Sequence, residues 1–110
     1  MANVFKNAVS ASVGTSAVDV YTAGSGVTAT VIGATVANRH SSSITVDATI
    51  TDSSASVTPF LVKAAPISTG SSLVLIGGDQ KVVLETGDKI TITSNTASSA
   101  DVIISVLEST

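Results

Sequence analysis

Residues 42–51, SSITVDATIT, decide the fold class of this 110-residue chain. Apolar side chains occupy every second position, at Ile44, Val46, Ala48 and Ile50, and the intervening residues are threonines and one aspartate. Successive side chains of a β-strand point to opposite faces, so this alternation places one face in a core and the other in water. The segment is therefore predicted to be a half-buried strand.

The same pattern recurs along the chain, separated by clusters of Gly, Ser, Asn and Asp that are typical of turns. Seven further strands are expected, at residues 17–22, 27–37, 58–64, 72–77, 80–85, 89–94 and 101–108. No window has helical periodicity, and the abundant Val, Ile and Thr oppose helix through their restricted χ1 angles. The sequence thus predicts one all-β domain over residues 1–110, an antiparallel β-sandwich or jelly-roll-like barrel of about eight short strands.

Several local features refine this prediction. Residues 1–15 are predicted to be an N-terminal arm that docks against a neighbour through Phe5 and Val9. Gly33, inside a long strand, predicts a bulge or a bend where the strand changes sheets. Pro59 indicates a strand start or an edge, and Phe60 beside it is expected to be internal. The adjacent Ile103 and Ile104 predict burial on both faces or a bulge.

The segment VVLETGDKITIT, residues 82–93, carries two carboxylates three residues apart, Glu85 and Asp88. A catalytic pair or a loose cation site is one interpretation. A turn is favoured, because Gly87 adopts positive φ at little cost and Asp88 can bond the nearby backbone. Catalytic pockets usually add His, Tyr, Asn or Arg, which this segment lacks. Gly87 and Asp88 are therefore predicted to form a structural turn, with both carboxylates in water. Val82, Leu84, Ile90 and Ile92 are expected to face the core.

Composition excludes several functional classes. Charged residues are 12% of the chain, against roughly 25% in typical domains, and 18 Ser with 15 Thr supply hydroxyls instead. The net charge is −3 and the five cations are scattered, so the basic footprint of a nucleic-acid binder is missing. No run is long enough for a membrane helix, and the first residues lack the apolar core of a signal peptide. Without Cys, no disulfide or thiolate metal site can form.

His40, the single histidine, lies beside Arg39 in a predicted loop. Zinc needs three or four ligands of His, Cys or carboxylate type, so one His leaves too few. No Gly-x-Ser-x-Gly element is present for a serine nucleophile. The sequence therefore predicts no catalytic residue, cofactor or metal. Arg39 and His40 are interpreted as an exposed loop or as contacts to a partner.

The order of motifs resembles small all-β virion proteins of tailed bacteriophages over about residues 16–108. The pieces that carry the resemblance are VAN (36–38), PISTGSSL (66–73) and LETGDKI (84–90), within the sequence of strands described above. The resemblance implies a non-enzymatic structural protein, made in the host cytoplasm and located in the virion. Its partners would be a protein lattice and copies of itself, with a trimer as one candidate.

Within that family, a head decoration (cement) protein that bridges neighbouring capsid subunits is the first expectation, and a neck, tail or fibre protein is the second. A carbohydrate-binding or adhesin-like β-sandwich is a separate alternative. Sugar sites commonly use exposed aromatic rings with polar groups around them, and aromatics are only 3% of this chain. A small hydrolase is disfavoured by the lack of a credible site.

Overall fold

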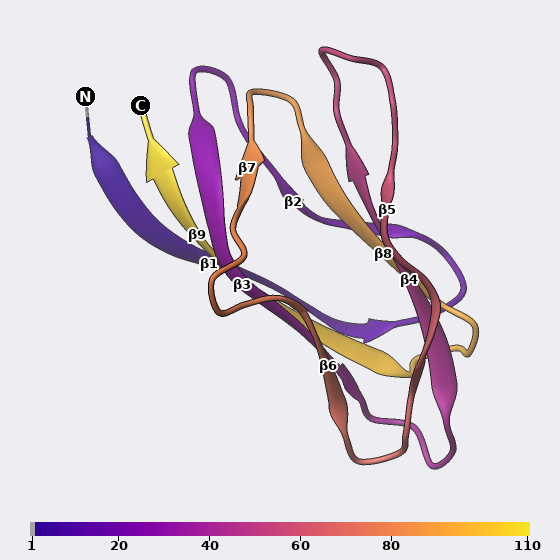
Figure 1. Cartoon of the computed structure of the whole chain (residues 1–110). Coiled ribbons are helices and arrows are strands. Elements are labelled where there is room, and N and C mark those ends of the chain that lie inside the picture. The colour runs from indigo at the N-terminus through magenta and orange to yellow at the C-terminus, as the bar shows by residue number, and fades with distance from the viewer. Residues whose placement is uncertain (1) are drawn as a thin grey trace.

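The computed structural model describes residues 2–110 and contains two antiparallel sheets packed face to face (Figure 1). Sheet A has the order β1-β9-β3-β6, and β7 also pairs with β3. Its strands are β1 (Asn3–Val13), β9 (Ala100–Ser109), β3 (Thr28–Asn38), β6 (Ser72–Ile76) and β7 (Val82–Leu84). Sheet B has the order β2-β8-β4-β5. Its strands are β2 (Val18–Thr22), β8 (Lys89–Ser94), β4 (Ile44–Thr51) and β5 (Phe60–Ile67). The predicted all-β sandwich is confirmed.

The core is aliphatic and lies between the two sheets. Ile44, Val46 and Ala48 of β4 are buried, and the threonines and the aspartate between them are partly exposed on the other face. Ile90 and Ile92 of β8 and Ile104 of β9 meet the same core. The alternation in the sequence thus translates directly into buried and wet faces.

Residues 1–15, predicted as an N-terminal arm, instead contain β1, which pairs antiparallel with β9 of the same chain from Asn3↔Ser109 to Val13↔Ala100. Met1 lies outside the described residues. The sequence does not predict this strand, because its inward positions, such as Lys6 and Ser10, are polar or small and break the apolar alternation. Those positions lie where the edge of the sandwich is half open, so polar residues are tolerated there.

Strand β3 carries the bulge that Gly33 predicts. The register with β9 shifts between Val31 and Gly33, and the extra residue, Ile32, is exposed. The strand stays in sheet A along its whole length, so it does not change sheets there. Pro59 precedes β5, an edge strand, as expected.

Two predictions about apolar side chains are wrong. Phe60 is 51% exposed and Ile103 is 56% exposed, whereas the sequence predicts both inside. Phe60 begins the edge strand β5, opposite Thr49 on the outward side of sheet B. Ile103 points away from the core because its neighbour Ile104 takes the inward position, and no bulge lies between them. Burial in β9 alternates from residue to residue between Ala100 and Val106, so Ile103 lies on the outward face although it is apolar.

Candidate functional site

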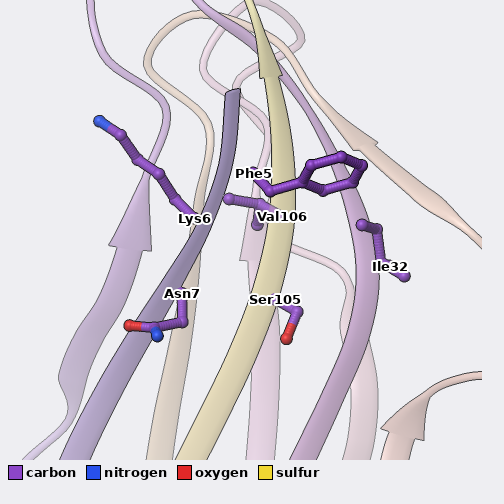
Figure 2. Close-up of a pocket in the computed structure, with 6 residues that line it drawn as sticks. All are labelled: Phe5, Lys6, Asn7, Ile32, Ser105 and Val106. Carbon is purple, nitrogen blue, oxygen red and sulfur yellow. The ribbon is translucent and has the colours of Figure 1, made fainter. Parts of the chain in front are cut away.

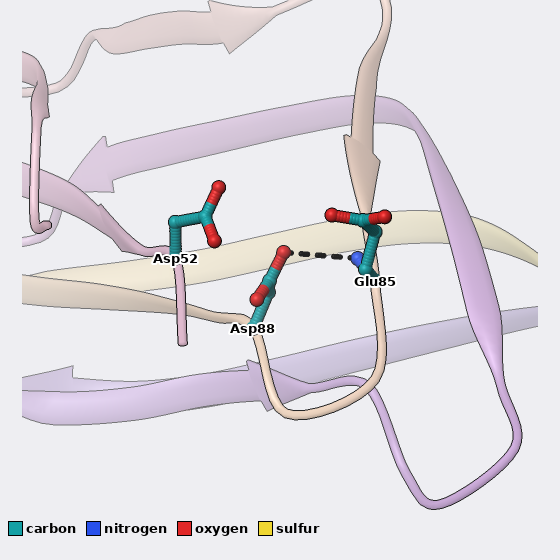
Figure 3. A group of neighbouring side chains, drawn as sticks. All are labelled: Asp52, Glu85 and Asp88. Carbon is teal, nitrogen blue, oxygen red and sulfur yellow. Dashed lines mark hydrogen bonds between the residues drawn. The ribbon is translucent and has the colours of Figure 1, made fainter. Parts of the chain in front are cut away.

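The turn at residues 85–88 joins β7 to β8, as predicted (Figure 3). Gly87 has φ of 88° and so needs a conformation that favours glycine. The Asp88 carboxylate accepts the backbone N–H of Glu85 at 3.0 Å and that of Ser53 at 3.0 Å. Asp88 is 3% exposed, so the prediction that it stays in water is wrong, whereas Glu85 is exposed as expected. Asp88 is buried because it holds two loops together.

Asp52 joins Glu85 and Asp88 in a group in which one carboxylate oxygen of each residue lies within 4.8 Å of the others. The two aspartates already have structural partners. Asp52 accepts the Ala55 N–H at 3.0 Å and the Ser54 hydroxyl at 2.9 Å. These bonds, led by that from Ala55, lower the pKa of Asp52. The geometry of this group is therefore explained by two turns that meet, each stabilised by an aspartate.

Arg39 and His40 lie in the loop after β3 and are held by their own chain. The Arg39 guanidinium donates to Asp101 at 3.2 Å and to the Ser12 hydroxyl at 2.8 Å, with about half of its side chain exposed. The His40 ring accepts the Ser42 N–H at 3.3 Å through Nδ1. The loop contributes a surface ion pair at one end of sheet A, and its role as a partner contact stays a prediction.

The most distinctive surface of the molecule is the outer face of sheet A, meaning the outward side chains of β1, β9, β3, β6 and β7. Cross-strand pairs place these side chains in rows across the sheet. The first row is Phe5, Leu107, Thr30 and Val83, and the second is Val9, Ile103, Thr35 and Val74. Five of them are large and strongly exposed: Phe5 75%, Val9 64%, Val74 62%, Val83 58% and Ile103 56%. Exposed apolar side chains in such contiguity are typical of an interaction site.

Between the two rows runs a third, made of small or polar residues: Asn7, Ser105 and Gly33. The surface is hollowed at Asn7 and Ser105, whose side chains are shorter than those of Phe5 and Ile32 on either side. The resulting open depression has a volume of about 360 Å³ and is walled by Phe5 and Ile32. Figure 2 shows the Phe5 ring extending over β9 toward Ile32, while Lys6 points to the opposite side of β1. The bulge at Ile32 thus completes the wall of the depression.

The outer face of sheet B differs sharply in chemistry. Its outward positions on β2, β8 and β4 are Asp19, Thr22, Lys89, Thr91, Thr93, Thr45, Asp47, Thr49 and Thr51. Lys89 pairs with Asp19 at 3.1 Å, and the Thr91 hydroxyl donates to Asp19 at 2.8 Å. Phe60 is an apolar exception, and it sits on the edge strand. The outer face of sheet B is therefore rich in hydroxyl groups and charges, and that of sheet A is apolar. Of these two faces, that of sheet A has the unusual composition for a surface in water.

Sequence reasoning found two members of this face, Phe5 and Val9, but for a different reason, as part of an arm. It missed Ile103, Val74 and Val83, because alternation identifies a strand without saying which of two apolar faces is covered. The signal that was available is the pair Ile103–Ile104, where both faces of β9 are apolar.

Comparisons with known proteins bear on the fold. No family model matches the sequence, and no curated protein matches it. A solved chain from Bacillus endospore appendages, described as disulfide-linked pili, superposes with a TM-score of 0.58 at 14% identity. The match covers 98% of this chain and 88% of the other, so the whole domain shares that fold. This chain has no cysteine, so the disulfide links of those pili have no counterpart in it. In the described residues, no helix of the length and apolarity needed to cross a membrane occurs.

Proposed function

We propose that this chain is a non-enzymatic structural subunit of a phage virion, most specifically a head decoration protein that bridges capsid subunits. The observation that carries the proposal is the contrast between the two outer faces of the sandwich. An apolar sheet face exposed to water is unfavourable, whereas the same face covered by a protein gains roughly 25 cal/mol for each Å² removed from water. The resemblance in motif order supports the assignment to a virion.

The geometry of the described residues favours structure over catalysis. Of the three carboxylates that come together, Asp52 and Asp88 each stabilise a turn, and Glu85 is exposed. His40 bonds its own loop and precedes β4, whereas Asp52 follows the opposite end of that strand. The depression on sheet A is lined by apolar, amide and hydroxyl groups together with Lys6, whose ammonium pairs with Glu108 at 3.2 Å. Such a surface binds by shape and burial, as a rigid module in an assembly does.

A subunit of a protein filament is the second candidate, favoured by the fold shared with a chain of Bacillus pili. A neck, tail or fibre protein of a virion is the variant of the first proposal that the resemblance also implies. A carbohydrate-binding module finds less support, because the two exposed phenylalanines lie on different sheets, Phe5 on sheet A and Phe60 on sheet B. They cannot form one stacking platform for a sugar ring.

The decisive experiment is quantitative mass spectrometry of purified phage particles that contain this chain, followed by cryo-electron microscopy. A copy number comparable with that of the major capsid subunit, with density on the outer shell, is the expected result. A copy number typical of a single ring would instead indicate that the chain belongs to the neck or tail. Its absence from particles, together with its presence in extracellular fibres, would favour the filament, and a positive glycan array would favour the sugar-binding module.

A further inference from the structure

We propose that the outer face of sheet A binds the same face of a second copy of this chain, which makes the free protein a two-fold symmetric dimer. The inference rests on the proposed role as an assembly subunit: a second copy covers the apolar face, and contacts with capsid subunits would use other surfaces of the dimer. It replaces the trimer that the resemblance suggested. Three properties of the face support a second copy as the occupant: its relief, its charge and its area.

The relief of the face is self-complementary. Its two rows of larger side chains flank the row of Asn7, Ser105 and Gly33, and the depression at Asn7 and Ser105 forms a groove between them that ends at Ile32. Rows on one face of a sheet are two residues apart, or about 7 Å. If two copies meet with an offset of one row, the ridge of Val9 and Ile103 in each copy fills the groove of the other. An isologous contact of this kind closes at two subunits.

The electrostatics favour self-association through this face in particular. The chain carries a net charge of −3, so two copies repel each other through most surfaces. None of the eight ridge residues and three groove residues is charged. The charges nearest the face form two ion pairs: Arg39 with Asp101 at 3.2 Å, and Lys6, which lines the depression, with Glu108 at 3.2 Å. Like charges are therefore not brought together when the same face of a second copy covers this one.

The size of the face matches what a stable dimer needs. Strand β9 has 10 residues, which corresponds to about 34 Å, and four strands side by side span about 19 Å. Their product is about 650 Å², close to the roughly 800 Å² that each partner buries in a standard interface. Stacked sheets lie about 10 Å apart, so the ridge of each copy can reach into the groove of the other without any change of backbone.

The first test measures the mass of the purified chain by sedimentation velocity over a range of concentrations. The wild type is expected to be a dimer, and Ile103→Lys is expected to weaken dimerisation by roughly 30-fold or more. Because Ile103 is exposed, the variant should fold, which circular dichroism would check. Thr93→Lys, on the outer face of sheet B, is the matched control and should leave the dimer unchanged. A monomer at all concentrations, a trimer, or a dimer that tolerates Ile103→Lys would overturn the proposal.

A second test uses the absence of cysteine from the sequence. Ser105→Cys places a single thiol in the groove of each copy. With an offset of one row, the two thiols lie about 7 Å apart along the strands, on sheets about 10 Å apart, which is too far for a disulfide. A bis-maleimide crosslinker that spans about 12 Å is therefore expected to link two copies. Thr93→Cys, with its thiol on sheet B, should remain unlinked under the same conditions. Equal linking of both variants would count against the proposal. The two hypotheses separate cleanly: a monomer found in virions overturns the dimer and leaves the virion function, whereas a dimer absent from virions does the reverse.

Discussion

The carboxylate of Asp88 accepts the backbone N–H of Glu85 at 3.0 Å, so the two acidic residues of one turn have opposite roles. Asp88 is buried and bonds to the backbone of two segments, whereas Glu85 presents its side chain to water. The short spacing that resembles an acid–base pair is thus explained by turn chemistry. This difference gives the first prediction.

Asp88→Ala should lower the free energy of unfolding by about 1–3 kcal/mol, because the N–H groups of Ser53 and Glu85 lose their acceptor in a partly buried site. Glu85→Gln is the control and should change it by about 0.5 kcal/mol or less, since its side chain is exposed. Urea unfolding followed by circular dichroism measures both. Equal effects of the two substitutions would contradict the assignment of Asp88 as the residue that holds the turn.

Gly87→Ala should cost about 1–3 kcal/mol, more than Gly70→Ala. Both glycines have positive φ, 88° and 75°, so both variants bear the strain of that conformation. Only at Gly87 does an added Cβ meet another atom, the Ser53 hydroxyl oxygen at 2.8 Å. That hydroxyl is held by bonds to Asp88 and to the carbonyl of Thr86. Thermal unfolding of the two variants compares them.

A double substitution tests the cause of that difference. Ser53→Ala removes the hydroxyl that the methyl group introduced by Gly87→Ala would strike. The pair of substitutions should therefore cost less than the sum of the two single changes. A strictly additive pair would show that the strain lies in the backbone alone.

The strands that the sequence predicts well are those with one apolar and one polar face. In β4 and β8 the alternation specifies both the strand and its inward side, because Ile44 or Ile92 has only polar residues beside it. In β9 the alternation fails, because Ile103 and Ile104 are equally apolar and only the packing of the second sheet decides which is covered. When the outward face of a strand is also apolar, the alternation of apolar and polar residues that would identify the inward side is lost.

The strand β1 illustrates the opposite failure. Its inward side carries Lys6, whose ammonium reaches Glu108 at 3.2 Å at the rim of the sandwich. A lysine at an inward position argues against a half-buried strand. Its partner, residue 108, is 102 residues from residue 6 in the sequence. Long-range pairing of this kind leaves no local pattern. The same holds for the burial of Asp88, which depends on Ser53 from another loop.

Asn38→Ala should lower the free energy of unfolding by about 1–3 kcal/mol. Asn38 is buried at the end of β3 and its amide donates to the carbonyl of Ile67, which belongs to sheet B, at 2.9 Å. Its side-chain oxygen accepts the His40 N–H at 2.7 Å. The loss of one side chain thus leaves groups on both sides of the sandwich without partners.

Asn95→Ala is the control. Asn95 also accepts a backbone N–H, that of Thr45, but at an exposed site where water can take the place of the side chain. Urea unfolding compares the two variants, and equal losses would contradict a special role for Asn38.

The Tyr21 hydroxyl donates to Glu108 at 2.5 Å and so connects β2 of sheet B with β9 of sheet A. This bond, followed by that from Lys6, lowers the pKa of Glu108. Burial, and then Glu108, raises the pKa of Tyr21. A lowered acid pKa stabilises the fold above the unfolded value near 4.5, and this contribution is lost as pH falls below it. A raised tyrosine pKa stabilises the fold below the unfolded value of 10.0, and this contribution is lost as pH rises above it.

Stability should therefore be highest between those two values and decline on both sides. Tyr21→Phe keeps the apolar ring in the core but removes the hydroxyl, so its alkaline decline should become shallower than that of the wild type. Its acid decline should shrink only in part, because hydrogen bonds that lower the pKa of Asp19 and of Asp52 persist. The measurement is the free energy of unfolding in urea from about pH 3 to about pH 11 for both proteins, a range that spans both unfolded pKa values. Identical alkaline profiles would mean that the Tyr21 phenol titrates alike in the folded and unfolded chain, and that the bond to Glu108 does not join the two sheets.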